Sequence, residues 1–297
     1  MTAVITVPSS LDDFTFEQVL DQLAPHPTDE KVIVDARHTS FATPFGLTAL
    51  LTLAQTREER AEFLPPEDPD TLSYWARAGF FRYAEDLFAV RGTVPRPRSA
   101  GESEVLLEVT PVTKSDDVHS VVERIQQKAA HILINKLHLE ARATMGFTMT
   151  LSEACQNIVE HAGRGGWVMV QTYRYKKRLS GRLVMVIAVC DAGVGFRRSL
   201  ESGQRRPLTD RWDDAMALET AVVNSVSRYG EAGRGQGLKG IRGYVHRRDG
   251  KLSVRSGTAR IAYVPPWDDD VPRREDLAPF PGAQLQITIP EKVGAPA

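Results

Sequence analysis

Two polar side chains in the C-terminal half of the chain have the types and the spacing of a metal-assisted site. Glu153 and Asn157 lie in LSEACQNIVEHA, and a separation of four residues puts them one turn apart on one helix face. Mg²⁺ prefers oxygen ligands and keeps several waters, so an amide oxygen facing a phosphate site would suit it. A carboxylate one turn away could orient or deprotonate an attacking water or hydroxyl. The alternative is a solvated polar stripe on an amphipathic helix.

A second motif, VCDAGVGF, follows an apolar strand. Asp191 ends that strand, and Gly193 and Gly195 come directly after it. A carboxylate in this position can accept a hydrogen bond from the exocyclic amine of adenine, which is worth roughly 1.5–3 kcal/mol. The glycines permit a positive φ and a close approach of backbone to ligand. The alternative is a simple glycine turn that leaves a strand.

Alternating glycines form the third motif, GRGQGLKGI, which leads into a helical stretch towards His246. Successive backbone N–H groups and a helix N-terminus together form an anion site. Neither the dinucleotide-binding spacing nor a P-loop pattern occurs in the chain, so both of those readings are excluded. The candidate phosphate contacts here are Arg234 and Lys239, beside Gly233, Gly235, Gly237 and Leu238. The alternative is that the two basic side chains are only solvated.

In this order the three motifs resemble the N, G1 and G2 boxes of the GHKL superfamily of ATP-binding proteins, over roughly half of the chain. The stretch LSEACQNIVEHA is most similar to the anti-sigma-factor serine kinases. The resemblance implies ATP and Mg²⁺ as cofactors, with Asn157 as the metal ligand and Glu153 as the catalytic carboxylate. It also implies that Asp191 holds the adenine amine and that Gly193 and Gly195 shape the base pocket.

The same resemblance assigns the phosphates to the glycine loop and an ATP lid to residues 196–232. It implies a two-layer α/β sandwich, the Bergerat ATP-binding fold. The chain departs from the family before its last strand, where Gly282 is followed by Ala283 instead of threonine. The hydroxyl that would support the pocket is therefore missing, which bears on turnover more than on binding.

The organisation of the chain predicts two domains. Residues 91–104 are rich in proline, glycine and charge and predict a linker between domains at residues 1–90 and 105–292. In the first domain, strands alternate with helices, as in a small α/β domain. In the second, clustered strands flanked by helices predict an α+β sandwich with helices on one face of a mixed sheet. The expected helices cover residues 14–23, 45–63, 70–81, 116–139, 140–161 and 212–228, and the expected strands cover residues 3–7, 31–36, 167–175, 182–191, 251–255, 259–264 and 284–289.

The segment VIVDARHTSFATPFGLTALL resembles the STAS domain of anti-sigma-factor antagonists, in which a phosphorylatable serine precedes a glycine. Here Thr43, Pro44 and Phe45 precede Gly46, so the usual acceptor is absent. Thr43 or Ser40 could substitute for it, but each is more typical of a helix cap or a loop hydroxyl. A STAS-like domain beside an ATP-binding domain implies a regulatory protein with a STAS-like or sigma-factor-type protein partner.

Composition limits the remaining possibilities. A formal net charge of −1 gives no field that would recruit nucleic acid or an anionic membrane. The longest apolar run, residues 183–190, is too short for a membrane helix, and no signal peptide is visible, so we expect a cytoplasmic protein. The two cysteines, Cys155 and Cys190, predict neither a disulfide framework nor a zinc site. Residues 267–274 are expected to form an exposed loop.

Three functions are compatible with these features. The first is an ATP- and Mg²⁺-binding signalling regulator that phosphorylates Ser or Thr on a partner or switches it through its nucleotide state. The second is a GHKL ATPase that forms a homodimer with nucleotide. The third is a non-catalytic module that binds ATP as a structural ligand.

Overall fold

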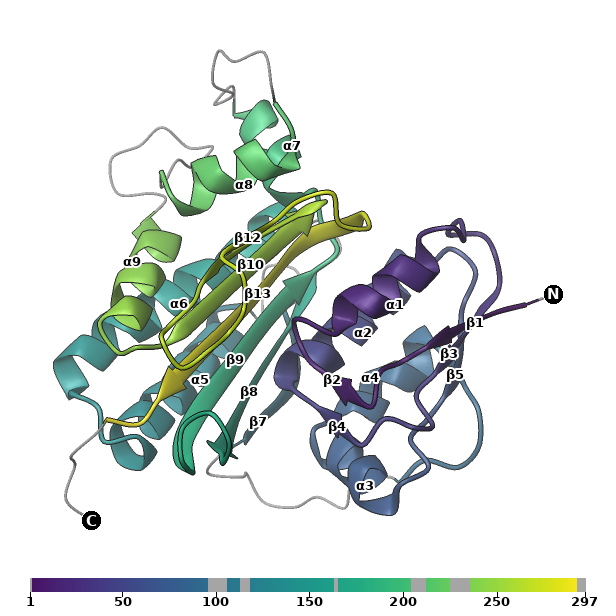
Figure 1. Ribbon diagram of the computed structural model, residues 1–297, viewed down its shortest axis with the longest axis horizontal. Helices are drawn as coiled ribbons and strands as arrows, with labels where there is room; N and C mark the ends of the chain where they lie inside the picture. The colour runs from purple at the N-terminus through teal and green to yellow at the C-terminus, as the bar shows by residue number, and fades with distance from the viewer. Residues whose placement is uncertain are drawn as a thin grey trace.

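The computed structural model describes residues 2–95, 106–112, 118–162, 165–203, 212–224 and 236–292. The chain is mixed α/β, as the sequence predicts, and it forms two modules that each contain one main sheet (Figure 1). The N-terminal module comprises residues 2–95, and the C-terminal module comprises the described residues from 106 onward. Among the described residues, no helix combines the length and the apolar character that a bilayer crossing requires.

The N-terminal module is an α/β unit around a parallel sheet with the strand order β1-β3-β5-β6. A short parallel ladder of β2 and β4 lies beside it. The strands are β1 (Ala3–Thr6), β2 (Ser10–Leu11), β3 (Val32–Asp35), β4 (Phe41–Ala42), β5 (Glu62–Leu64) and β6 (Ala89–Val90). The helices are α1 (Phe16–Leu23), α2 (Pro44–Thr56), α3 (Pro69–Arg77) and α4 (Phe80–Leu87).

Two of the helix predictions in this module were wrong in extent. The helix expected over residues 45–63 ends at Thr56, where Arg57 turns to extended backbone before β5. The helix expected over residues 70–81 is two helices, because Gly79 has a φ of 79° that ends α3 and redirects the chain into α4.

The C-terminal module contains a seven-stranded sheet with the order β12-β11-β10-β13-β9-β8-β7. All of its pairings among the described residues are antiparallel, whereas a mixed sheet was expected. Its strands are β7 (Leu106–Val112), β8 (Gly166–Tyr175), β9 (Arg182–Asp191), β10 (Lys251–Gly257), β11 (Ala259–Tyr263), β12 (Arg273–Arg274) and β13 (Phe280–Pro290). Its helices are α5 (Val118–His131), the π-helical turn η1 (Ile132–Lys136), α6 (Ala141–Ala162), α7 (Gly195–Ser202), α8 (Asp214–Val222) and α9 (Gln236–His246).

One face of this sheet carries the helices of its own module. Met185, Ile187 and Val189 alternate along β9 and share a buried core with residues of α5, α6, α8 and α9. We call this the helix face of the sheet. The expected sandwich of helices on a sheet is therefore present on this side.

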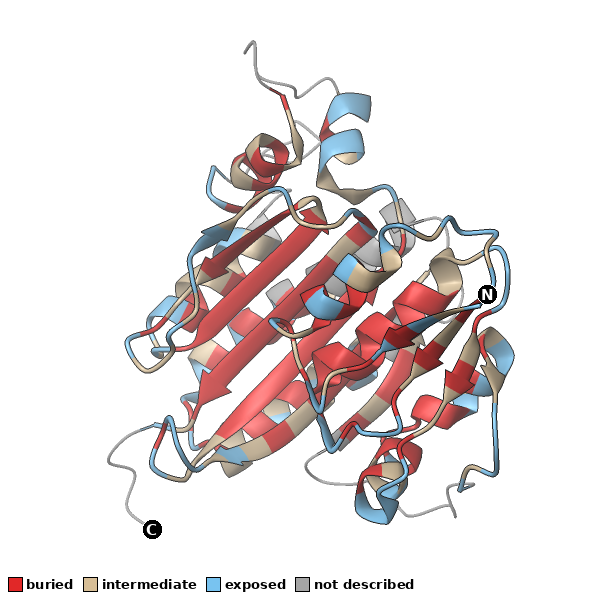
Figure 2. Ribbon diagram, turned by 45° about the vertical axis from the view of Figure 1, so that its right-hand side comes forward, coloured by how far each residue is buried: buried red, intermediate tan, exposed pale blue. Residues whose placement is uncertain are grey.

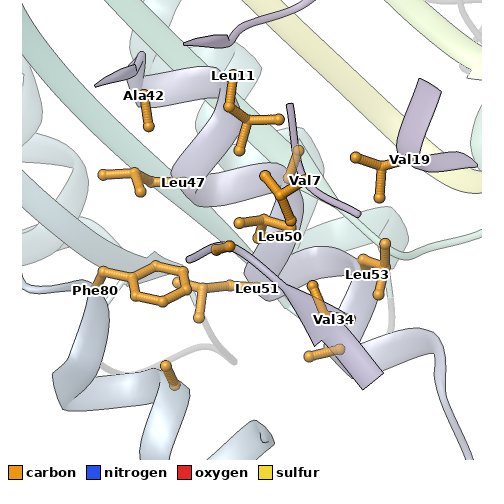
Figure 3. Close-up of a cluster of buried hydrophobic side chains, with 14 of the residues drawn as sticks. Val7, Leu11, Val19, Val34, Ala42, Leu47, Leu50, Leu51, Leu53 and Phe80 are labelled. Atoms are coloured by element: carbon orange, nitrogen blue, oxygen red, sulfur yellow. The ribbon is translucent and has the colours of Figure 1, made fainter. Parts of the chain in front are cut away.

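The opposite face of the sheet is covered by the N-terminal module (Figure 2). Helix α2 packs against β8, β9 and β13, and every residue from Pro44 to Ala54 is buried. A helix that is apolar on all sides is stable only when both of its sides are covered. Figure 3 shows the N-terminal side of this core, where Leu47, Leu50 and Leu51 of α2 lie among side chains of their own module. The same cluster includes Met169 of β8 and Ala188 of β9. The two modules thus share one hydrophobic core.

Candidate functional site

The end of β9 positions the acidic residue of the second motif. Since side chains alternate along a strand, Asp191 lies on the same side of the sheet as Val189 and Ile187, which is the helix face. Cys190 points the other way, where its sulfur accepts a hydrogen bond from the Thr48 hydroxyl of α2 at 3.3 Å. Strand alternation therefore places Asp191 on the helix face and Cys190, its neighbour, at the contact with the N-terminal module.

The carboxylate of Asp191 is held in a buried, hydrogen-bonded position. The residue is 7% exposed, and its Oδ1 accepts a hydrogen bond from the Gly193 N–H at 2.8 Å. Burial raises the pKa of Asp191 to about 6, although hydrogen bonds from the backbone N–H groups of Gly193 and Ala283 act to lower it. Buried carboxylates with a pKa raised in this way are concentrated at functional sites.

Ala283 and Gln284, at the start of β13, contact Asp191. Its backbone N–H donates to the Asp191 carboxylate. Gln284, the next residue, donates from Nε2 to the main-chain oxygen of Asp191 at 3.1 Å. The start of β13 therefore supports Asp191 through backbone and amide groups, without a hydroxyl.

Glycines allow the turn after Asp191 to pack tightly against β13. Gly195 has a φ of 71°, and a Cβ there would lie 2.8 Å from Ser256 Oγ. Gly282 has a φ of 80°, and a Cβ there would lie 2.0 Å from the main-chain oxygen of Asp191. Ser256 joins the two segments, because its hydroxyl donates to Gly282 O at 2.7 Å and accepts from the Phe196 N–H at 3.1 Å. Gly195 therefore permits a close approach of the backbone to Ser256 and Gly282, which belong to the protein rather than to a ligand.

Ser256 was not among the residues that the sequence singled out, and Gly282 was noted only for the alanine that follows it. Gly282 reaches Asp191 because β13 pairs with β9, and Ser256 reaches Gly282 because β10 pairs with β13. The only sequence feature that pointed to this contact was the position of Gly282 before the last strand.

Helix α6 carries the first motif. It is continuous from Ala141 to Ala162, so positions 153 and 157 lie one turn apart on a single helix. The side chains of Glu153 and Asn157 lie outside the described atoms. The helix is anchored to α9 by Tyr244, which stacks on Phe147 at 4.5 Å between ring centroids and lies 3.3 Å from the Thr144 hydroxyl.

Helix α9 begins at Gln236, inside the third motif, and ends at His246 as expected. Gly233, Arg234 and Gly235 lie outside the described residues, and Gly237 is in the first turn of the helix. Leu238 packs against the core of the helix face, whereas Lys239 is exposed. The described parts of the three motifs therefore lie on one face of the sheet, where α6 and α9 are in contact.

The segment expected to form a lid contains α7 and α8, and α8 is a fixed part of the fold. Leu218 and Val222 of α8 belong to the core of the helix face. Asp214 accepts hydrogen bonds from the N–H and the hydroxyl of Thr258 at 3.0 and 3.1 Å, which ties the helix to the turn between β10 and β11. A closing segment over residues 196–232 therefore does not include α8.

The two hydroxyls considered as phosphate acceptors have structural partners. Thr43 is 6% exposed; it caps α2 by accepting from the Gly46 N–H at 3.3 Å and donates to Leu11 O at 3.3 Å. Ser40 is exposed and donates to Ser9 O at 3.1 Å. Thr43 thus acts as a helix cap, the more typical role for a hydroxyl at this position.

Comparison with known proteins adds no assignment: no family model matches the chain, and no curated protein matches it. In the described part of the chain, no three His, Cys, Asp or Glu side chains are grouped so that they could hold a metal ion.

Proposed function

We propose that this chain binds ATP with Mg²⁺ on the helix face of the large sheet, among α6, the end of β9 and the start of α9. The observation that carries the proposal is the buried carboxylate of Asp191, held by two backbone N–H groups on the side of the sheet where α6 and α9 pack. An acceptor in an apolar setting fits the exocyclic amine of adenine, and it discriminates against a base that presents a carbonyl there.

The remaining roles follow from the motifs. In the proposal Asn157 is the protein ligand of Mg²⁺, and Glu153 orients or deprotonates the attacking hydroxyl. The glycine loop of Gly233, Gly235 and Gly237, with Arg234 and Lys239, holds the phosphates at the N-terminus of α9. Bound Mg-ATP supplies the phosphoryl group. The protein acts as a cytoplasmic signalling regulator of the anti-sigma-factor-kinase type, either by phosphoryl transfer or by nucleotide-state switching.

The acceptor hydroxyl belongs to a separate protein in this proposal. The support for this choice is the buried capping role of Thr43, whose hydroxyl has two partners within its own module. The partner expected from the STAS-like character of the N-terminal module is a STAS-like or sigma-factor-type regulator.

A non-catalytic ATP-binding module is the second candidate, and Ala283 favours it. The alanine leaves the adenine side of the site without the usual hydroxyl, although its N–H still supports Asp191. Binding without turnover would then be the function of the site.

Calorimetric titration with ATP, with and without Mg²⁺, tests the proposal. We expect a dissociation constant on the order of 1 μM, about −8 kcal/mol, for wild-type protein with Mg²⁺. Asn157→Ala should abolish the Mg²⁺-dependent part of that affinity, while Asn135→Ala, at a position outside the motifs, serves as the matched control. Absence of ATP binding would contradict the proposed site. Equal binding of ATP and GTP would contradict the role of Asp191 as the acceptor for adenine.

A second assay separates the kinase from the non-catalytic module. ATP labelled on the γ-phosphate is incubated with the protein and candidate partner proteins. Transfer to Ser or Thr that is lost in Glu153→Ala supports the kinase. Tight binding with no transfer and background hydrolysis supports the non-catalytic module, and hydrolysis with nucleotide-dependent homodimers would identify an ATPase instead.

A further inference from the structure

A cavity of about 640 Å³ lies between the two modules. It is on the face of the large sheet opposite to α6 and α9, because its strand residues Gln286 and Thr288 alternate with Ile287 and Ile289 of the helix face. Cavities of this size accommodate a small organic molecule rather than a bare ion. Its lining includes Asp13, Phe14 and Phe41 of the N-terminal module and Tyr175, Trp267 and Gln286 of the C-terminal module.

The floor of the cavity contains buried charges that do not balance. Lys251 Nζ lies 2.8 Å from Asp270 and 3.3 Å from Asp268, and Arg260 binds the same Asp270 through both terminal nitrogens. Asp13 Oδ2 is left 3.6 Å from Arg260 and 3.9 Å from Lys251. Three carboxylates thus share two cations, so full ionisation of these five groups leaves one net negative charge, and Asp13 is the carboxylate that lies farthest from the cations.

The loop expected to be exposed supplies two of these carboxylates, which corrects that prediction. The side chains of Asp268 and Asp270 are 4% and 3% exposed. Arg178 at the mouth of the cavity is shared between Asp268 and the exposed Asp269, so this further pair leaves the balance of the floor unchanged. Local sequence could not reveal the burial of Asp268 and Asp270, because the residues that surround them come from β10, β11 and the N-terminal module.

Two acceptor atoms on the floor have no hydrogen-bond donor. Gln286 Nε2 donates to Asp13 Oδ1 at 2.7 Å, but Asp13 Oδ2 and Gln286 Oε1 are buried and accept no hydrogen bond. Both residues are 5% exposed. Burial raises the pKa of Asp13, although Lys251 and Arg260 act to lower it. Unpaired buried acceptors are unfavourable, so this pair is suited to a ligand that brings N–H donors and a positive charge.

Aromatic rings form much of the wall. Phe14 is 51% and Phe41 39% exposed, and Phe41 meets Tyr173 edge-on at 5.5 Å between ring centroids. Tyr175 and Trp267 form a second edge-on pair at 6.2 Å. Such rings cover an apolar ligand body and attract a cation through their faces.

The mouth of the cavity limits the charge of the ligand. Arg174, Lys176 and Lys177 lie there and are basic. Charges at the solvent edge are screened by salt, so they do not repel a single buried cation strongly, but they disfavour a ligand with several positive charges.

We propose that this cavity binds a small, singly charged organic amine or amidine, whose N–H groups donate to Asp13 Oδ2 and Gln286 Oε1 and whose apolar body packs against Phe14, Phe41 and Trp267. The site draws residues from both modules and lies across the sheet from Asp191. Ligand binding in this cavity does not depend on nucleotide binding, so it can be measured without nucleotide.

The test is calorimetric titration of the full chain with benzamidine and with 2-phenylethylamine, using neutral 2-phenylethanol as the shape-matched control. We expect saturable binding of at least one cation with one site per chain, at least about tenfold tighter than the alcohol. Asp13→Asn should weaken cation binding at least about tenfold, since it removes the buried charge. Asp269→Asn makes the same charge change at an exposed edge and should alter the affinity less than about threefold.

A second variant keeps the test decisive if Asp13→Asn does not fold. Phe14→Ala removes a half-exposed ring, which carries the Arg274 guanidinium on one face at 5.4 Å. It should weaken cation binding at least about threefold with only a small fall in the thermal midpoint. The proposal is overturned if neither cation binds saturably up to about 10 mM, if the alcohol binds as tightly as the amines, or if both Asp13→Asn and Phe14→Ala bind like wild type.

Discussion

Arg255 of β10 donates two hydrogen bonds to Glu17 of α1, from Nε to Oε1 at 2.8 Å and from Nη2 to Oε2 at 3.1 Å. Both residues are buried, at 1% and 3% exposure. The pair joins the C-terminal sheet to the N-terminal module at a place with little water, where a lost partner leaves an uncompensated charge.

Glu17→Ala should therefore lower the free energy of unfolding by about 3–5 kcal/mol, because the Arg255 guanidinium stays buried without its carboxylate. The double variant Glu17→Leu with Arg255→Met should lose less stability than Glu17→Ala, since an apolar pair of similar volume replaces both charges and only the main-chain oxygens of Gly257 and Ala278 lose a donor. Urea denaturation of the three proteins measures both values. A Glu17→Ala variant as stable as wild type would contradict the buried pairing of Glu17 with Arg255.

Asp191 should make stability depend on pH in an identifiable window. Its pKa rises from an ordinary value of 3.8 to about 6 on folding, so the folded state binds the proton more tightly than the unfolded chain. Protonation of Asp191 therefore adds to the free energy of unfolding below about pH 4. This stabilisation is lost as the pH rises through about 6, a change of about 3 kcal/mol.

The matching variant is Asp191→Asn, which should remove that slope and be more stable than wild type at about pH 8. Asp86→Asn changes an exposed carboxylate and should leave the slope intact. Denaturation curves at several pH values report the result, and a slope unchanged in Asp191→Asn would exclude this residue as its source. Under the proposed function, affinity for ATP should also rise as the pH passes about 6, because the ionised carboxylate is the better acceptor.

Gly46 should tolerate no side chain. A Cβ there would lie 2.7 Å from both Cγ and the main-chain oxygen of Leu11, so either α2 or the β2 segment has to move. Gly46→Ala should cost about 1–3 kcal/mol. Gly146 in α6 is the matched control, because a Cβ there meets nothing within 4 Å. Gly146→Ala should stabilise the protein by about 0.5–1 kcal/mol through helix propensity, and thermal unfolding distinguishes the two signs.

Thr43 should behave as a helix cap. Thr43→Ala removes the acceptor for the Gly46 N–H and should cost about 1 kcal/mol, whereas Thr43→Ser keeps the oxygen and should cost less. Chemical denaturation gives both values. Mass spectrometry after incubation with Mg-ATP should find no phosphate on Thr43, and modification there would show that the capping hydroxyl becomes accessible.

The sequence by itself determined the local pattern of this protein. The hairpin of β8 and β9 is confirmed, with β9 covering residues 182–191 as expected, because apolar runs and a polar turn define strands without reference to the rest of the chain. It also placed Asp191 at a strand end and predicted a helix that leads from the glycine motif towards His246. The ATP-binding assignment itself stays a prediction.

Only the tertiary structure decided what covers each face. Leu285, Ile287 and Ile289 alternate with polar residues, which locally indicates a strand with one solvated side. Instead Gln284, Gln286 and Thr288 are buried at 0%, 5% and 2% exposure beneath the N-terminal module. Periodicity tells which side chains share a face, but the cover of that face comes from residues more than two hundred positions away, such as Asp13 and Glu17, which no local pattern can specify.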